Sequence, residues 1–253
     1  MRGRFIWIAS LMTLRELFRR RIVILLVVLI PSVFYLVTVL TTNMAPIPFQ
    51  LAAVQGEPSL MVPARYIGLV FMGLASTGLL AAFLSMNLIQ WDFHVTRRLI
   101  VCGYRPSEVS LSKLSVMLVL IILVGFYVGC MLRLFFQPDD FLSVIFGFIL
   151  AGFVYGSYGL LIGSLLRGEL EGILLITLLA NIDIGWLQNP IFYSGSLNKA
   201  LIRVLPAFYP SQMSNISAFS EFGIGKAFSG SLLYGTVLLM AAMLIFWLRM
   251  KRK

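Results

Sequence analysis

Long stretches without a charged side chain constrain this 253-residue chain more than any other feature of its sequence. Five such apolar stretches cover residues 22–56, 66–91, 114–132, 141–166 and 227–248. A sixth, from 172 to 198, contains Asp183 as its only charged residue. A membrane-spanning helix needs about 20 apolar residues, and a charge at the centre of a bilayer costs about 2.5 to 3.5 kcal/mol. The pattern therefore predicts an all-α integral membrane protein with six spans.

Prolines set the end of the first span. We expect this helix to end near Asn43, because Pro46 and Pro48 stop a helix and disfavour helical geometry just before them. Pro31 lies inside the span and is expected to kink it. We predict a single transmembrane domain over residues 1–253. Its predicted spans are 22–43, 66–91, 114–132, 141–166, 172–190 and 227–248.

The charge balance predicts an orientation. The chain has 20 Lys and Arg residues against 10 Asp and Glu residues, an excess that would suggest nucleic-acid binding in a soluble protein. Only 12% of its residues are charged and 60% are hydrophobic, whereas a soluble domain has about 25% and 45 to 50%. We therefore expect the basic residues to lie beside the lipid bilayer and to bind no nucleic acid. With six spans, 15 Lys and Arg residues fall on the side of both termini and 5 on the other, so both termini are predicted to be cytoplasmic.

The first segment outside the spans, residues 2–20, predicts an amphipathic helix that lies in the plane of the membrane surface. Its apolar stripe consists of Trp7, Leu11, Leu14 and Phe18. Arg4, Arg15 and Arg19 flank the stripe, while Glu16 and Arg20 lie roughly opposite. The alternative is a plain membrane anchor that leads into the first span.

The second segment, residues 92–113, joins spans two and three. Residues 97–102 are expected to form a short helix that Gly103 ends, and Pro106 precedes the next helix. The short helix would mix basic and aliphatic side chains, a composition that suits docking on another protein. The alternative is a solvated basic turn that meets lipid headgroups.

The third segment, residues 188–226, contains Pro190, Pro206 and Pro210 together with short apolar pieces. It is too apolar for a free loop. Short helices that dip into the outer leaflet before the last span would bury these pieces.

Polar residues within the spans predict either a substrate path or a dimer seam, that is, a contact surface with a second membrane-spanning chain. Asp183 is the carboxylate to single out, because a charge along a span should face protein or water and not lipid. The alternative is that span five ends early and Asp183 lies near the outer interface. The candidate residues of this path or seam are Tyr35, Thr38, Thr42, Asn181, Asp183 and Trp186.

Glycines four residues apart predict close packing between helices. They occur in the third and fourth spans and are Gly125, Gly129, Gly152, Gly156, Gly159 and Gly163.

Catalytic and metal sites are not expected on this chain. His94 is the only histidine, and no close cluster of Cys, His or carboxylates has the spacing of metal ligands. Asp139 and Asp140 follow Pro138 and are expected to start the fourth span, where negative charge suits the helix dipole. The run Gly223-Ile224-Gly225-Lys226-Ala227 lacks the spacing of a P-loop and its Ser or Thr after the lysine. We therefore expect no cofactor on this chain.

The order of these segments resembles the permease subunits of ABC-2 type transporters, and the resemblance covers nearly the whole chain. It is carried by Leu14-Arg15-Glu16-Leu17-Phe18-Arg19-Arg20-Arg21, by Thr96-Arg97-Arg98-Leu99 through Gly103 to Lys113, and by Leu205-Pro206 followed by Tyr209-Pro210.

The resemblance implies an exporter permease in the cell membrane of a bacterium or archaeon. It would pair with a second permease chain, identical or homologous, and with two separate ATPase subunits that bind ATP and Mg. The apolar spans with few charges favour a hydrophobic or amphipathic substrate, for example a drug, an antibiotic, a lipid or a glycan-like molecule. The implied ATPase contacts are Arg15, Glu16, Arg19, Arg97, Arg98, Leu99, Ile100, Val101, Gly103, Tyr104 and Arg105.

Two other classes of function stay open. A stand-alone channel or secondary carrier would transport without a partner, and such carriers often have paired charges or repeats within the membrane. A membrane-embedded lipid-modifying enzyme would need a cluster of titratable residues at the interface, which the sequence does not offer.

Overall fold

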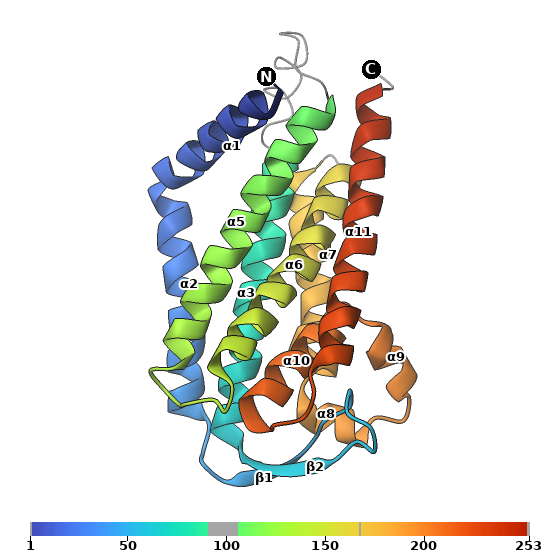
Figure 1. Cartoon of the computed structure of the whole chain (residues 1–253). Helices are drawn as coiled ribbons and strands as arrows, with labels where there is room; N and C mark the ends of the chain where they lie inside the picture. The colour runs from blue at the N-terminus through green and yellow to red at the C-terminus, as the bar shows by residue number, and fades with distance from the viewer. Residues whose placement is uncertain (1, 91–105, 167, 252–253) are drawn as a thin grey trace.

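The computed structural model describes residues 2–90, 106–166 and 168–251 (Figure 1). Six helical segments within these ranges are long and apolar enough to cross a membrane. They are α2 (Arg21–Thr41), α3 (Ala64–Gln90), α5 (Pro106–Leu132), α6 (Phe141–Leu165), α7 (Glu169–Ala180) continued by the π-helix η1 (Asn181–Leu187), and α11 (Gly225–Lys251). The chain is thus a mainly helical, multi-pass membrane protein, as its apolar stretches predict.

Several helices extend beyond the apolar stretches that predict them. Helix α5 begins at Pro106, well before residue 114, and includes Lys113. The Lys113 side chain is buried, and its Nζ donates a hydrogen bond of 2.6 Å to the carbonyl oxygen of Leu88 near the end of α3. A charge therefore marks where the apolar part of a helix stops and not where its backbone hydrogen bonds stop.

The fourth span, α6, lies at the centre of the bundle and packs against α3, α5, α10 (Phe208–Phe219) and α11. Helix α1 (Arg2–Arg19) crosses α5 (Figure 1). Helix α2 packs against α3 and α5 at the edge of the bundle (Figure 1). Both termini lie at one end of the bundle, together with the last residues of α3 and the first of α5. We call this the terminal end and the opposite end the hairpin end.

The hairpin end contains a β-hairpin, which the pattern of prolines and apolar residues does not predict. Strand β1 (Pro46–Gln50) pairs antiparallel with β2 (Ser59–Pro63), with Pro46 opposite Pro63. Phe49 and Val62 are buried, whereas their neighbours along each strand are more exposed. Prolines are tolerated because every strand of a two-stranded sheet is an edge. Gly56 and Glu57 adopt positive φ angles of 81° and 43° in the connection.

Three short helices follow the fifth span at the hairpin end. They are α8 (Pro190–Gly195), α9 (Lys199–Val204) and α10. Most of α10 is buried against α6 and α11, and Met213 and Ile216 share a core with Phe49 and Leu51 of the hairpin segment. The hairpin and these helices thus form one cap over this end of the bundle.

Asp140 starts the fourth span, as its position after Pro138 predicts. It is the N-cap of α6 and accepts hydrogen bonds from the backbone nitrogen and the hydroxyl of Ser143. These two bonds hold the pKa of the Asp140 carboxyl below its ordinary value.

Candidate functional site

A groove of about 480 Å³ separates α2 from α3 near the hairpin end. Aliphatic and aromatic side chains form most of its wall, and Thr38, Thr41 and Thr42 line it from α2. Asn189, between η1 and α8, and Ile47 of β1 also reach the groove. No charged side chain is among these lining residues. The groove therefore suits a molecule that is apolar or amphipathic and uncharged where it is bound.

The threonine hydroxyls give the groove its polar character. Thr38 Oγ1 donates 2.8 Å to the Phe34 carbonyl oxygen, and Thr41 Oγ1 donates 2.7 Å to that of Val37. Thr42 Oγ1 donates to the Thr38 carbonyl oxygen. Because each hydroxyl donates its hydrogen bond to a carbonyl oxygen of its own helix, it can only accept a hydrogen bond from a ligand. A ligand with a hydroxyl or amide donor fits this arrangement.

Tyr35 does not line the groove with Thr38 and Thr42, although the sequence makes all three candidates for one substrate path or dimer seam. Its side chain is fully buried, and its hydroxyl donates 3.1 Å to the carbonyl oxygen of Val128 in α5. Its ring lies 5.7 Å from that of Phe135. Tyr35 therefore ties α2 to α5.

Asp183 lies in η1 with its side chain fully buried. Tyr155 Oη of α6 donates 2.6 Å to Oδ2, and the Ala207 backbone nitrogen donates 2.8 Å to the same oxygen. Gln188 Nε2 donates 3.0 Å to Oδ1 and also reaches the carbonyl oxygen of Ile202 at 3.2 Å. Among the described residues no Lys or Arg pairs with this carboxylate. Three neutral donors thus stabilise the buried carboxylate and tie the fifth span to α6 and to the cap.

The other two candidates of the fifth span lie on its outer surface. Asn181 is exposed, and its Nδ2 donates 2.8 Å to the carbonyl oxygen of Thr177. Trp186 is 57% exposed and packs edge-to-face on Phe192. Of the three polar or aromatic candidates in this span, the structure brings only Asp183 into the protein interior.

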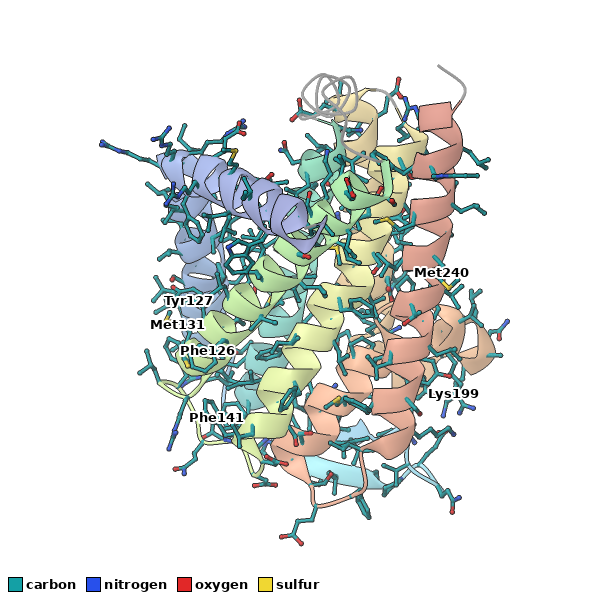
Figure 2. All side chains as sticks on the ribbon, turned by 45° about the horizontal axis from the view of Figure 1, so that its top comes forward. Phe126, Tyr127, Met131, Phe141, Lys199 and Met240 are labelled. Atoms are coloured by element: carbon teal, nitrogen blue, oxygen red, sulfur yellow. The ribbon has the colours of Figure 1, made fainter. Side chains whose placement is uncertain are left out.

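Ion pairs close the cap at the hairpin end. Glu57 accepts from Lys199 Nζ at 3.1 Å and from the Arg203 guanidinium. Lys199 also donates 3.3 Å to Gln50 Oε1 and lies over the Tyr193 ring, 5.2 Å from its centroid. Figure 2 shows Lys199 at this end of the molecule. These contacts join the connection between β1 and β2 to α8 and α9, next to the groove.

Only three of the predicted ATPase contacts lie within the described residues. Arg15, Glu16 and Arg19 are exposed on α1, and Glu16 Oε1 pairs with Arg20 at 2.9 Å. Arg97, Arg98, Leu99, Ile100, Val101, Gly103, Tyr104 and Arg105 lie outside the described residues. The residues that flank them, Gln90 and Pro106, lie at the terminal end with α1 (Figure 1).

The six glycines singled out from the sequence lie where helices approach closely. A Cβ atom added to Gly125 or Gly129 would lie 2.7 Å or less from a side chain of α6, and one at Gly152 or Gly156 would lie 2.9 Å from Ile121 of α5. Gly159 and Gly163 instead face the backbone of α3. The third and fourth spans thus meet through small residues on both sides.

Sequence reasoning misses the partners of Asp183. Tyr155 lies between Gly152 and Gly156 on α6, so the spacing of glycines already places it on the inward face of that helix. Gln188 and Ala207 carry no such signal, because the π-helical turn and the cap bring them to the carboxylate.

No family model matches the chain, and a search of curated proteins finds no match to it either. In the described residues, no group of three or more His, Cys, Asp or Glu side chains could hold a metal ion.

Proposed function

We propose that this chain is the membrane-spanning permease subunit of an ABC exporter. It acts with a second permease chain, identical or homologous, and with two separate ATPase subunits that bind ATP and Mg. The terminal end faces the cytoplasm, where anionic lipid and the positive-inside bias both favour the excess of basic residues.

One observation carries this proposal. Helix α1 packs across α5 at the same end of the bundle where α3 ends at Gln90 and α5 begins at Pro106. An ATPase docked on this end would touch both α1 and the segment that joins α3 to α5. A force applied to residues 92–105 would be passed to α3 and α5, two of the helices that pack against α6.

The groove between α2 and α3 is the proposed substrate contact. Its apolar wall and threonine hydroxyls suit a hydrophobic or amphipathic cargo that enters from the membrane. Outward apolar side chains, such as Phe126 of α5 and Met240 of α11, would face lipid or the second permease chain (Figure 2).

The test is purification of the tagged full chain from its own host in mild detergent, with bound proteins identified by mass spectrometry. A subunit with a P-loop is expected, and the complex is expected to hydrolyse ATP in lipid nanodiscs. The double substitution Arg98→Glu with Val101→Asp should lower the amount of bound ATPase by about tenfold, the ratio that about 1.4 kcal/mol produces.

Lys226→Glu, at the hairpin end, is the charge-reversal control for Arg98→Glu and should leave the bound ATPase unchanged. Recovery of a chain that transports cargo after reconstitution alone, without any nucleotide-binding subunit, would overturn the proposal in favour of a stand-alone carrier.

A further inference from the structure

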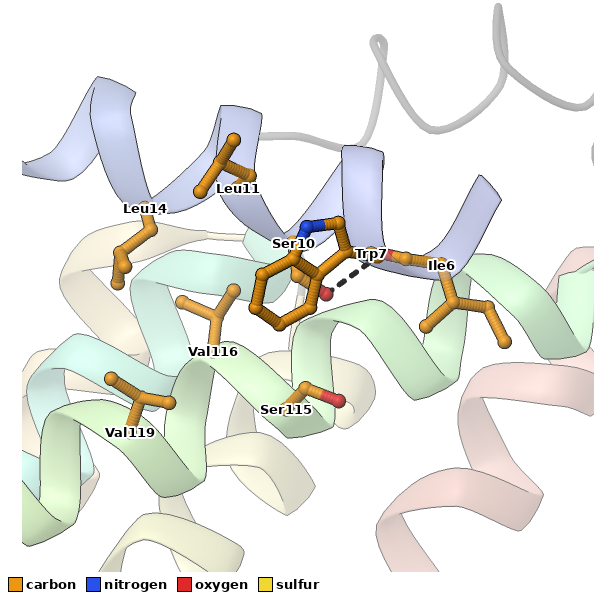
Figure 3. Close-up of a pocket in the computed structure, with 8 residues that line it drawn as sticks. All are labelled: Ile6, Trp7, Ser10, Leu11, Leu14, Ser115, Val116 and Val119. Atoms are coloured by element: carbon orange, nitrogen blue, oxygen red, sulfur yellow. Dashed lines mark hydrogen bonds between the residues drawn. The ribbon is translucent and has the colours of Figure 1, made fainter. Parts of the chain in front are cut away.

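A second groove, of about 260 Å³, lies between α1 and α5 at the terminal end. Ile6, Trp7, Ser10, Leu11 and Leu14 line it from α1, and Ser115, Val116 and Val119 line it from α5 (Figure 3). The indole of Trp7 projects from α1 toward α5 over this groove. The volume is below the 300 to 1,000 Å³ that is typical of pockets for whole small molecules. The groove therefore fits one arm of a larger molecule.

The interior of this groove offers a ligand no free hydroxyl hydrogen from its two serines. Ser10 Oγ lies within hydrogen-bond distance of the carbonyl oxygens of Ile6, at 2.9 Å, and Ser112, at 3.3 Å. Ser115 Oγ donates 2.9 Å to the carbonyl oxygen of Leu111. Both hydroxyl hydrogens are thus used within the protein, and the remaining wall is aliphatic or aromatic. A hydrocarbon chain fits these surroundings better than a polar segment does.

The groove opens toward lipid. Val119 belongs to the spanning part of α5 and is 41% exposed, and Trp7 is 69% exposed. An exposed tryptophan at the end of a membrane-spanning bundle is typical of the membrane interface. The molecules available at such an opening are membrane lipids.

Basic side chains follow the groove along α1. Arg15 lies one helical turn after Leu11, and Arg19 lies one turn after Arg15. Both are exposed, and neither forms an ion pair within the described part of the chain. The acidic residue of this helix, Glu16, pairs with Arg20 instead. An anionic group beside Arg15 would complement this charge.

We propose that the groove between α1 and α5 binds one acyl chain of an anionic phospholipid, with the lipid headgroup beside Arg15. The bound lipid would fix the angle at which α1 crosses α5. This site does not depend on the proposed transport function, because it is formed by α1 and α5 alone.

The test uses the purified full chain in neutral detergent, without an ATPase or nucleotide, and native mass spectrometry as the readout. The two lipids are dioleoyl phosphatidylglycerol and dioleoyl phosphatidylcholine, which share their acyl chains and differ in net charge. The anionic lipid is expected to bind about fivefold more tightly, the ratio that about 1 kcal/mol for one Arg beside an anionic lipid produces.

Variants separate the acyl-chain site from the headgroup site. Ser115→Phe should fill the groove and abolish the tight binding of both lipids, and Val119→Trp, at a more exposed position, should act in the same way if Ser115→Phe fails to fold. Ser229→Phe on α11 is the matched control for bulk, because Ser229 is exposed and its hydroxyl likewise bonds to its own helix.

Arg15→Gln should keep acyl-chain binding but bring the affinities of the two lipids close together. The control Lys226→Gln should keep the preference for the anionic lipid. Unchanged lipid binding in both groove-filling variants, or an unchanged preference for the anionic lipid in Arg15→Gln, would overturn the proposal. A second protein chain bound in place of lipid would also overturn it.

Discussion

In α6, 72% of the residues in the most apolar 18-residue window are buried inside the chain, whereas in α2 the share is 17%. Yet α2 has the higher mean hydropathy of the two. In a bilayer, an apolar surface gains nothing by leaving lipid for protein, so the most hydrophobic helix has the least reason to be buried. In this pair the more apolar helix faces lipid and the glycine-rich one packs against protein. Hydropathy alone does not decide burial, since α3 and α11 have the same mean hydropathy of 2.1 but are 67% and 22% buried.

The two helices also differ in how they meet their neighbours. α6 presents glycines to α3 and α5, and at Gly159 it approaches the α3 backbone directly. α2 presents large aliphatic side chains outward, such as Leu36 and Leu40, which are 54% and 74% exposed. We therefore expect substitutions in α6 to act on stability and substitutions on the outer face of α2 to act on what binds there.

The largest effect on stability is expected from Gly159→Ala. The added Cβ would lie 2.1 Å from the carbonyl oxygen of Ala82, so α3 and α6 would have to move apart. Because backbone cannot rotate away as a side chain can, the cost should exceed about 3 kcal/mol of the free energy of unfolding. The measurement is unfolding of the purified chain by sodium dodecyl sulfate in mixed micelles.

Gly223→Ala is the matched control, since nothing lies within 4 Å of the Cβ position at Gly223. Equal stability of the two variants would mean that α3 and α6 do not pack as closely as described.

A smaller loss is expected from Asp183→Asn. The amide would place a donor where the carboxylate now accepts from Gln188 Nε2, leaving one buried donor without an acceptor. The free energy of unfolding should fall by about 1 to 2 kcal/mol. Asp139→Asn makes the same chemical change at an exposed position and should have almost no effect. If both substitutions are equally mild in the same unfolding assay, the contact between the fifth span and the cap does not stabilise the fold.

The smallest effect on stability is expected from Val37→Trp on α2. Val37 lines the groove between α2 and α3 but is 51% exposed, so the free energy of unfolding should change by less than about 0.5 kcal/mol. The indole should occupy the groove and lower ATP-driven export by the reconstituted complex. A complex with Leu40→Trp, on the same helix but outside the groove, should export its substrate at the normal rate. Equal export by the two variants would remove the groove from the substrate path.

The spans could be predicted from the sequence because the cost of a charge in lipid acts on each residue by itself. The six apolar stretches and the helix start at Asp140 follow from such local rules. The spacing of the glycines in α5 and α6 places them on one face of each helix, because four residues bring a side chain back to the same face. That this face meets another helix follows from their small size.

The cap could not be predicted in the same way, because it depends on contacts between distant residues. Pro46 and Pro48 correctly exclude a helix, but the hairpin is held by Phe49 against Met213 and Ile216, which lie far along the chain. Asp183 was singled out for its charge, whereas its three donors come from α6, from the end of η1 and from the turn before α10. A π-helical turn changes which residues face inward, and a helical wheel does not anticipate it.

The ion pairs of Glu57 with Lys199 and Arg203 can form only late in synthesis of the chain. Lys199 and Arg203 follow Glu57 by 142 and 146 residues along the chain. At a ribosomal rate of 5 to 20 residues per second, roughly 7 to 30 s pass between the synthesis of Glu57 and that of Lys199. During this interval the first two spans can already be inserted while their connection still lacks its cationic partners. A nascent chain halted before residue 199 would therefore expose this connection to proteases, and completing the chain would protect it.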